Sequence, residues 1–252
     1  MNILMIDTSG PACGVAIASG GQVICELQLT SGRTHSQRVM LMVDQALEMC
    51  EMTVSDIDLF GAVAGPGSFT GVRIGVATVK ALAHAAGKPC IGVDALEALA
   101  ANVTGFDGVI CPILDARAQQ VYGAMFESGM PPVRMMEDTA EKLTAFLDRV
   151  EGTGCDALFV GDGAAAFEGM IRERLGARAH FAPAQHQGLR AASACALAMQ
   201  YAGNEENLSD CMTLLPLYLR APQAERERAA KEAAKKTANE AAQKAEEAGR
   251  NG

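Results

Sequence analysis

Histidine is scarce in this sequence, with four residues in 252. His35, His84, His180 and His186 form neither an HxxxH nor an HExxH pair, the spacings that place two imidazoles on one face of a helix. A two-histidine helical metal site, and with it a metallopeptidase of that kind, is therefore excluded. We predict that this chain binds no metal through such a site.

Paired cysteines are also lacking, although the chain has eight cysteines. No CxxC pair occurs, and no histidine stands at ligand spacing from a cysteine. Most of the thiols fall within apolar runs, which predicts small buried side chains in a reducing compartment. The positions are Cys13, Cys25, Cys50, Cys90, Cys111, Cys155, Cys195 and Cys211.

Long apolar runs are missing as well. The longest, Ile3 to Ile6 and Ile57 to Ala64, have the length of strands and are interrupted by Asp or Gly. The N-terminus has no basic start followed by an apolar segment, as a signal peptide would. With 49% hydrophobic and 20% charged residues, the composition predicts a globular, cytoplasmic protein without a membrane association.

Positive charge is in deficit, because the formal net charge is −9. Residues 223–252 hold seven Lys/Arg and six Glu, so residues 1–222 hold 14 basic and 24 acidic side chains. A body this acidic repels a phosphate backbone, and we expect any RNA to be held through a partner. The last thirty residues are rich in Ala, Glu and Lys and predict a solvated helix or disorder.

What the sequence does contain is a repeated arrangement. Residues 1–30 read as three β-rich runs separated by Ser-Gly turns, and residues 109–126 repeat the layout of strand, Asp, turn and strand. Apolar spacing predicts helices over 35–51 and 72–86 and, further on, over 137–150. The repeat predicts an α/β protein with a first subdomain at 1–105, a smaller second subdomain at 106–222 and a tail at 223–252.

The string AGPGSFTGVRIG, residues 64–75, follows a predicted buried strand and precedes a helix. It matches neither the Walker loop nor the dinucleotide fingerprint, and it is not a GxSxG elbow. Its amides could face an anion, or Gly65 and Gly67 could form a tight turn with Ser68 or Thr70 capping the helix.

Asp7 and Asp115 offer a similar choice, because each ends a strand in one half of the repeat. They could hold a metal–nucleotide complex between the halves, or each could accept hydrogen bonds from its own turn. Gly161 and Gly163 open a helix after a strand, as in an adenosine pocket or a plain strand-to-helix turn.

Taken together, the Asp-ended first hairpin, Thr34-His35-Ser36 and GPGSFTG-x-RIG resemble the TsaB (YeaZ) family, and LDARAQQVYGAMF and PLYLRAPQAE resemble its downstream motifs. The resemblance covers residues 1 to about 225. It implies the duplicated actin/sugar-kinase/Hsp70-like (ASKHA) fold, with two βββαβα-type subdomains and mixed sheets. It also implies a non-catalytic subunit that supports a TsaD-like catalytic subunit and a TsaE-like ATPase in tRNA threonylcarbamoyladenosine formation. The competing function is a nucleotide-dependent phosphotransferase or ATPase on the same fold.

The resemblance further implies that the first two helices meet TsaD, or a second copy of the chain. It implies that this chain itself requires no cofactor, and that any ATP or ADP and Mg²⁺ belong to the complex. The expected interface residues are Val39, Val43, Ala46, Leu47, Val72, Val76, Val79 and Ala83. The candidate nucleotide or anion cleft comprises Asp7, Thr8, Gly65, Gly67, Ser68, Thr70, Asp115, Gly161 and Gly163.

Overall fold

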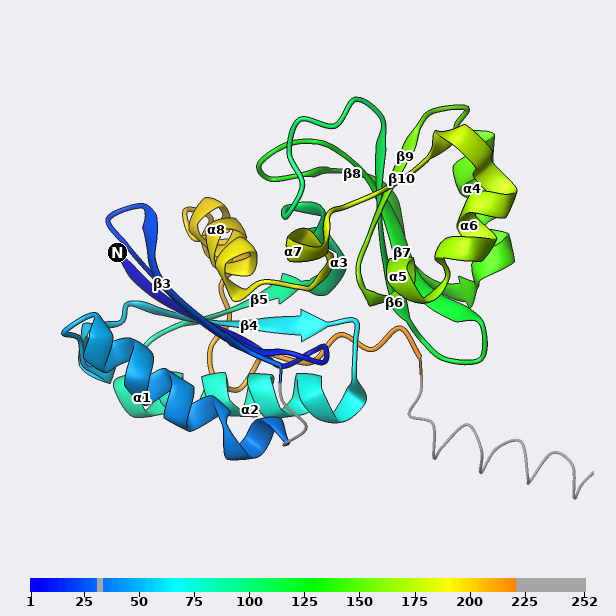
Figure 1. Ribbon diagram of the computed structural model, residues 1–252. Helices are drawn as coiled ribbons and strands as arrows, with labels where there is room; N and C mark the ends of the chain where they lie inside the picture. Colours follow the sequence, from blue (N-terminus) through cyan, green and yellow to red (C-terminus); the bar gives the residue numbers. More distant parts are fainter. Residues whose placement is uncertain (31–33, 221–252) are drawn as a thin grey trace, which may run out of the picture. The chain divides into compact units, whose positions relative to one another are not determined.

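The computed structural model describes residues 1–30 and 34–220, and within these ranges the strands form two five-stranded mixed sheets (Figure 1). Residues Met1–Leu219 are one compact unit. The predicted tail, residues 223–252, lies outside the described residues. No helix in the described ranges is long and apolar enough to cross a membrane.

The first sheet has the strand order β3-β2-β1-β4-β5. Its first three strands, predicted as three β-rich runs, form an antiparallel meander, while β4 and β5 run parallel to β1. The strands are β1 (Asn2–Asp7), β2 (Cys13–Ser19), β3 (Gln22–Leu29), β4 (Leu59–Gly65) and β5 (Cys90–Asp94).

The second sheet repeats this order as β8-β7-β6-β9-β10. A central strand again has an antiparallel hairpin on one side and two parallel strands on the other. The strands are β6 (Val109–Asp115), β7 (Gln120–Glu127), β8 (Val133–Lys142), β9 (Ala157–Val160) and β10 (Ala179–Phe181). The matching topology confirms the predicted duplication and the ASKHA-type fold class.

Helices cover both faces of the first sheet. Because successive side chains of a strand point to opposite faces, Leu4 and Ile6 contact one helical layer while Ile3 and Met5 contact the other. The first layer contains α1 (Val39–Met49) and α2 (Phe69–Ala86), and the second contains α3 (Ala95–Ala100) and α8 (Ala191–Tyr201). Helix α8 lies in the segment predicted for the second subdomain, yet it packs on the first sheet.

The second sheet has its own helices and its own apolar cluster, in which Phe146 and Phe159 are fully buried. The helices are α4 (Leu143–Gly152), α5 (Asp162–Ala166) and α6 (Glu168–Leu175), and a short α7 (Ala184–Gln187) leads toward α8. The helix predicted over 137–150 begins only at Leu143. Residues 137–142 instead form the end of β8, where 139–142 pair with β7, so that part of the prediction is wrong.

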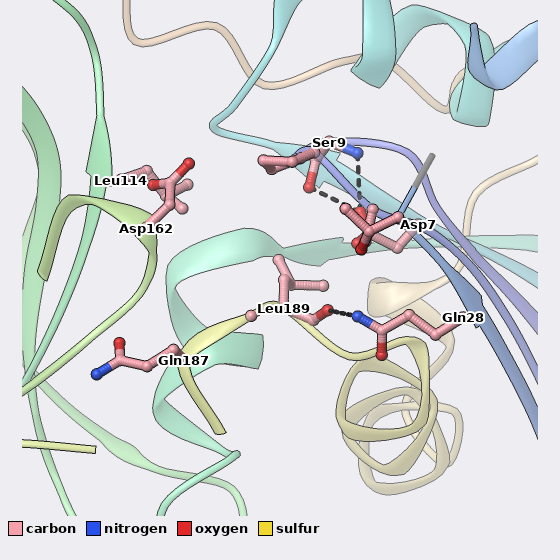
Figure 2. A pocket seen from close by; sticks show the side chains of 12 residues that line it. Asp7, Ser9, Gln28, Leu114, Asp162, Gln187 and Leu189 are labelled. Atoms are coloured by element: carbon pink, nitrogen blue, oxygen red, sulfur yellow. Dashed lines mark hydrogen bonds between the residues drawn. The ribbon is translucent and has the colours of Figure 1, made fainter. Parts of the chain in front are cut away.

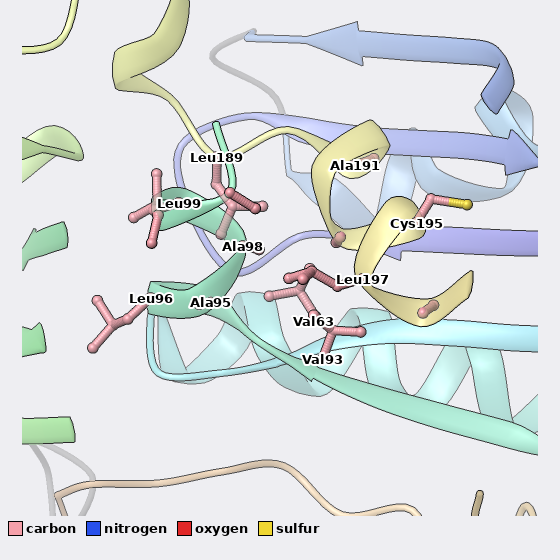
Figure 3. Packing of buried hydrophobic residues seen from close by; sticks show 14 of the residues in the cluster. Val63, Val93, Ala95, Leu96, Ala98, Leu99, Leu189, Ala191, Cys195 and Leu197 are labelled. Carbon is pink, nitrogen blue, oxygen red and sulfur yellow. The ribbon is translucent and has the colours of Figure 1, made fainter. Parts of the chain in front are cut away.

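One buried cluster is shared by the two halves of the compact unit. Leu96 and Leu99 of α3 pack together with Phe126 and Val160 of the second sheet, and with Leu197 of α8. Figure 3 shows α3 and α8 facing each other over Val63 and Val93 of the first sheet. The halves are therefore joined by a continuous apolar core as well as by the chain.

The segment after α8 returns to the first sheet, where residues 209–219 form a C-terminal strap. Ser209 exchanges two backbone hydrogen bonds with Cys90, and Leu214 is buried in the core beneath α1 and α2. Farther along, the Leu217 amide donates to the Ala64 carbonyl at 2.7 Å. The strap thus fixes the edge of the first sheet near α2.

Candidate functional site

The glycine loop 65–71 packs directly on the turn that follows β1. The Ser68 amide donates to the Ser9 carbonyl at 2.7 Å, and Thr8 Oγ1 donates to the Gly71 carbonyl at 2.7 Å. A Cβ at Gly67 would lie 2.5 Å from the Ser9 carbonyl oxygen, and one at Gly71 would overlap the Thr8 carbonyl oxygen. The glycines therefore permit a backbone-to-backbone contact that no other residue allows.

The same loop also starts α2. Ser68 is its N-cap, and its hydroxyl accepts a hydrogen bond from the Gly71 amide. This geometry supports the structural interpretation of the loop, in which it holds α2 against the first sheet.

The two strand-ending aspartates make the same local turn in the two halves. Asp7 Oδ1 accepts hydrogen bonds from the amide and hydroxyl of Ser9, at 2.8 and 2.7 Å. Asp115 Oδ1 accepts from the Arg117 amide at 2.8 Å. Each carboxylate thus stabilises its own hairpin, as the structural interpretation requires.

The two aspartates differ in environment. Asp7 is 2% exposed, and its burial raises its pKa although the hydrogen bonds from Ser9 act in the opposite direction. Asp115 is exposed, and its amide donates to Asp162 Oδ1 at 3.0 Å. The first hairpin therefore carries a buried carboxyl, whereas the carboxyl of the second hairpin is exposed.

A cavity of about 180 Å³ opens between the first hairpin and the start of α5 (Figure 2). Asp7 and Asp162 face it from the two halves, and burial raises the pKa of both carboxyls. The lining consists of Asp7, Ser9, Gly10, Pro11, Ala12, Gln28, Thr30, Leu114, Asp162, Gln187, Gly188 and Leu189.

The two glutamines in this lining are tied to the backbone. Gln28 Nε2 donates to the Leu189 carbonyl at 3.2 Å, as drawn in Figure 2. Gln187 accepts from the Gly161 amide at 3.2 Å and donates to the Ala182 carbonyl at 2.6 Å. Each glutamine side chain is thus held to a backbone segment on the cavity's edge by at least one hydrogen bond.

A nucleotide fits this cavity poorly. Among the described residues that line it there is no Lys or Arg, and two carboxyls point into it. The volume is also below the roughly 300–1,000 Å³ usual for pockets that bind small molecules. Against these described lining residues a phosphate chain would meet two carboxyls and no Lys or Arg, which disfavours nucleotide binding.

Of the nine predicted cleft residues, Asp7 lines the cavity. Gly161 and Gly163 bracket Asp162, which sequence reasoning missed although the two glycines marked its place. Gln28 and Gln187 carried no sequence signal, because nothing in their local pattern reveals what lies opposite them in the fold. The remaining members of the prediction, Thr8, Gly65, Gly67, Ser68, Thr70, Asp115, Gly161 and Gly163, are absent from the lining.

The eight residues predicted for the partner interface are buried in the chain's own core. Each is at most 5% exposed, and all belong to the cluster between α1, α2 and the first sheet. The assignment of these side chains to a partner surface is therefore wrong, because helical periodicity marked the face that covers the sheet. The set is Val39, Val43, Ala46, Leu47, Val72, Val76, Val79 and Ala83.

The outer faces of the same helices nevertheless expose apolar side chains. On α1 these are Met40, Leu41 and Met49, which are 43%, 48% and 73% exposed. On α2 the exposed residues include Ala77 and Ala81. Within residues 1–30 and 34–220, no group of three His, Cys, Asp or Glu side chains is arranged to hold a metal ion.

Known proteins match this chain along most of its length. The TsaD family model, described as tRNA N6-adenosine threonylcarbamoyltransferase, matches residues 28–228. The Bacillus subtilis (strain 168) tRNA threonylcarbamoyladenosine biosynthesis protein TsaB is 34% identical over 227 residues, 89% of this chain and 96% of that protein. The Escherichia coli (strain K12) protein of the same name is 38% identical over 129 residues, 50% of this chain and 55% of its own.

A solved structure agrees with these matches. YeaZ from Pseudomonas aeruginosa superposes with a TM-score of 0.74 at 26% identity, covering 86% of this chain and 99% of its own. Two sheets of identical strand order, with an aspartate turn in each half, define a duplicated α/β protein of the actin-like class. Within that class, the chain belongs to the TsaB (YeaZ) family.

Proposed function

We propose that this chain is a non-catalytic subunit of the machinery that forms threonylcarbamoyladenosine in tRNA. In this proposal it supports a TsaD-like catalytic subunit, together with a TsaE-like ATPase, and the tRNA is held through the complex. The proposal follows from the function named for the Bacillus subtilis relative, which this chain matches over 89% of its length.

The lining of the cleft supports the part of the proposal in which this chain is not the catalytic subunit. Asp7 accepts hydrogen bonds from its own hairpin and Asp162 accepts one from the Asp115 amide, and the described residues that line the cavity include no basic group. The lining of the cleft therefore favours a binding subunit over a nucleotide-dependent enzyme.

The alternative function, a phosphotransferase or ATPase, makes a different prediction. Purified chain alone would then hydrolyse ATP, and Asp7→Ala would abolish the turnover. We expect no sustained hydrolysis by the chain alone. Turnover that disappears in the Asp7→Ala variant would reverse this part of the proposal.

The main test is transfer of the threonylcarbamoyl group to unmodified tRNA by the TsaD-like and TsaE-like subunits, with and without this chain. We expect modification to require the chain, and the chain to elute with the TsaD-like subunit in size exclusion. Full modification in its absence would contradict the proposal.

We place the partner surface on the outer faces of α1 and α2, where Leu41 is exposed and Ala77 lies on the neighbouring helix. Leu41→Arg should weaken binding to the TsaD-like subunit by about tenfold or more, as truncating a central apolar contact commonly does. Val133→Arg is a matched control, because Val133 is 57% exposed on β8 of the second half. Equal affinities for the two variants, measured by titration calorimetry, would place the surface elsewhere.

A further inference from the structure

A thiol and an imidazole meet away from the cleft, where α2 lies beside the C-terminal strap. The Sγ atom of Cys211 lies 3.6 Å from Nδ1 of His84, within hydrogen-bonding distance for sulfur. His84 is exposed near the end of α2, and Cys211 is half-buried in the strap. Solvent and small molecules can therefore reach the pair.

The fold holds this pair in place from two sides. Lys80, one helical turn before His84, donates from Nζ to the carbonyl oxygens of Met212 and Leu214 at 3.2 and 3.0 Å. The Asp210 carboxylate accepts from the Met212 and Thr213 amides, both at 2.7 Å. The turn that carries Cys211 is thus fixed against the same face of α2 that carries His84.

Cys13, Cys90, Cys195 and Cys155 lack this combination of access and a proton acceptor. Burial raises the pKa of Cys13 and Cys90 to about 11 and of Cys195 to about 12, and a thiol kept protonated is a poor nucleophile. Cys155 is exposed, but its Sγ faces the Thr153 carbonyl oxygen at 3.5 Å. A carbonyl accepts a hydrogen bond but does not take up the proton.

We propose that Cys211 is a nucleophilic thiol that hydroperoxides oxidise, and that His84 accepts its proton. In the reaction the thiol proton passes to His84, and the sulfur attacks one peroxide oxygen. An S–O bond forms, the O–O bond breaks, and the departing oxygen takes the proton from His84. Cys211 becomes a sulfenic acid and the hydroperoxide is reduced to an alcohol, or to water when the probe is hydrogen peroxide.

The test measures sulfenic acid at each cysteine of the full chain after treatment with hydrogen peroxide, trapped with dimedone and mapped by peptide mass spectrometry. Cys155 is the internal reference, because it is exposed but faces no imidazole. We expect Cys211 to be trapped about tenfold faster or more, since a positioned base commonly contributes on the order of a hundredfold. Equal rates at the two cysteines would overturn the proposal.

His84→Asn separates the imidazole from simple exposure of the thiol. In this variant the rate at Cys211 should fall to that of Cys155, while the thermal midpoint stays unchanged because His84 is exposed. His180→Asn is the matched control, since His180 is a surface histidine of the second sheet and pairs with Asp156. If His84→Asn lowers the thermal midpoint, His84→Gln replaces it. An unchanged Cys211 rate in a folded His84 variant would remove His84 from the site.

Discussion

Substitutions in the glycine loop should have unusual effects on stability, because the loop packs against the backbone of the turn after β1. In a helix, replacing Gly by Ala normally stabilises the folded state by about 0.5–1 kcal/mol. Gly71 lies in the first turn of α2, but the contact with the Thr8 carbonyl leaves no room for a methyl group. The local backbone preference and the packing therefore act in opposite directions.

We expect Gly71→Ala to lower the free energy of unfolding by about 1–3 kcal/mol, the usual cost of overpacking. Gly169→Ala is the matched control, because Gly169 is an exposed residue of α6 with no atom within 4 Å of its added Cβ. That variant should be neutral or more stable than the parent chain. Urea unfolding of both variants measures the difference, and a stabilising Gly71→Ala would contradict the close contact.

The buried carboxyl of Asp7 gives a prediction for the pH dependence of stability. Its pKa in the folded chain is above the ordinary value of 3.8, so its contribution to stability is complete below pH 3.8. That contribution is lost as pH rises through the folded pKa, where the buried carboxyl must ionise. Asn cannot ionise, and its side-chain oxygen can still accept the hydrogen bonds from Ser9.

The thermal midpoint of Asp7→Asn, relative to the parent chain, should therefore increase as pH rises above 3.8. Differential scanning calorimetry over a pH series measures this difference. Ser9→Ala is a useful comparison because it removes the hydroxyl donor but leaves Asp7 ionisable. A midpoint difference for Asp7→Asn that does not change with pH would contradict the raised pKa.

At the scale of an element, α1 shows two faces with different roles. Val43 is fully buried against the first sheet, whereas Leu41 is 48% exposed on the opposite face. A charged substitution at Val43 or Val79 would place an unpaired charge in the core and destabilise the fold, so neither variant can test partner binding. Variants of the exposed face are needed for that purpose.

We expect Val43→Ala to lower the free energy of unfolding by roughly 2 kcal/mol, through lost burial and the cavity that remains. Leu41→Ala should change it by no more than about 0.5 kcal/mol. Guanidinium unfolding followed by circular dichroism compares the two variants of one helix. Equal losses would mean that α1 does not pack through the Val43 face.

Sequence patterns predicted most elements of the fold, and the wrong prediction over 137–142 has a physical cause. The two strand–Asp–strand hairpins were recognisable because each places an aspartate at the end of an apolar strand. Residues 137–142, in contrast, contain good helix formers, yet the pairing of 139–142 with β7 holds them in β8. Local propensity could not reveal a partner strand some twenty residues earlier in the chain.

The candidate site was less predictable for the same reason. The sequence marked Asp7 and the glycines around Asp162, but the cavity depends on how the two halves face each other. Likewise, the apolar residues of α1 and α2 could cover either the sheet or a partner, and periodicity alone does not separate these cases. Burial in the folded chain was required to assign them.

At the scale of the whole molecule, the two halves behave as one structural unit. The cluster around α3 and α8 joins both sheets. In addition, Nη2 of Arg134 in β8 lies 3.4 Å from Oδ1 of Asp94 at the end of β5. Burial and the neighbouring Asp138 raise the pKa of Asp94 well above its usual range, while Arg134 acts in the opposite direction. These contacts couple the stability of one half to that of the other.

Thermal unfolding of the chain should therefore show one transition with equal calorimetric and van't Hoff enthalpies. Leu99→Ala, in the shared cluster, should shift that single transition to lower temperature, at a cost of about 2–5 kcal/mol. Scanning calorimetry provides both measurements. Two separate transitions, with Leu99→Ala moving one of them, would show that the halves unfold independently.

The position of α8 also bears on how the protein is made. The face of the first sheet formed by Ile3, Met5 and Ala16 is covered by residues 191–201, which lie far from it along the chain. Since synthesis proceeds from the N-terminus, this apolar face stays open on the ribosome until α8 has emerged. The strands translated first thus complete their packing among the last, and the nascent chain exposes a surface that a chaperone can bind throughout most of translation.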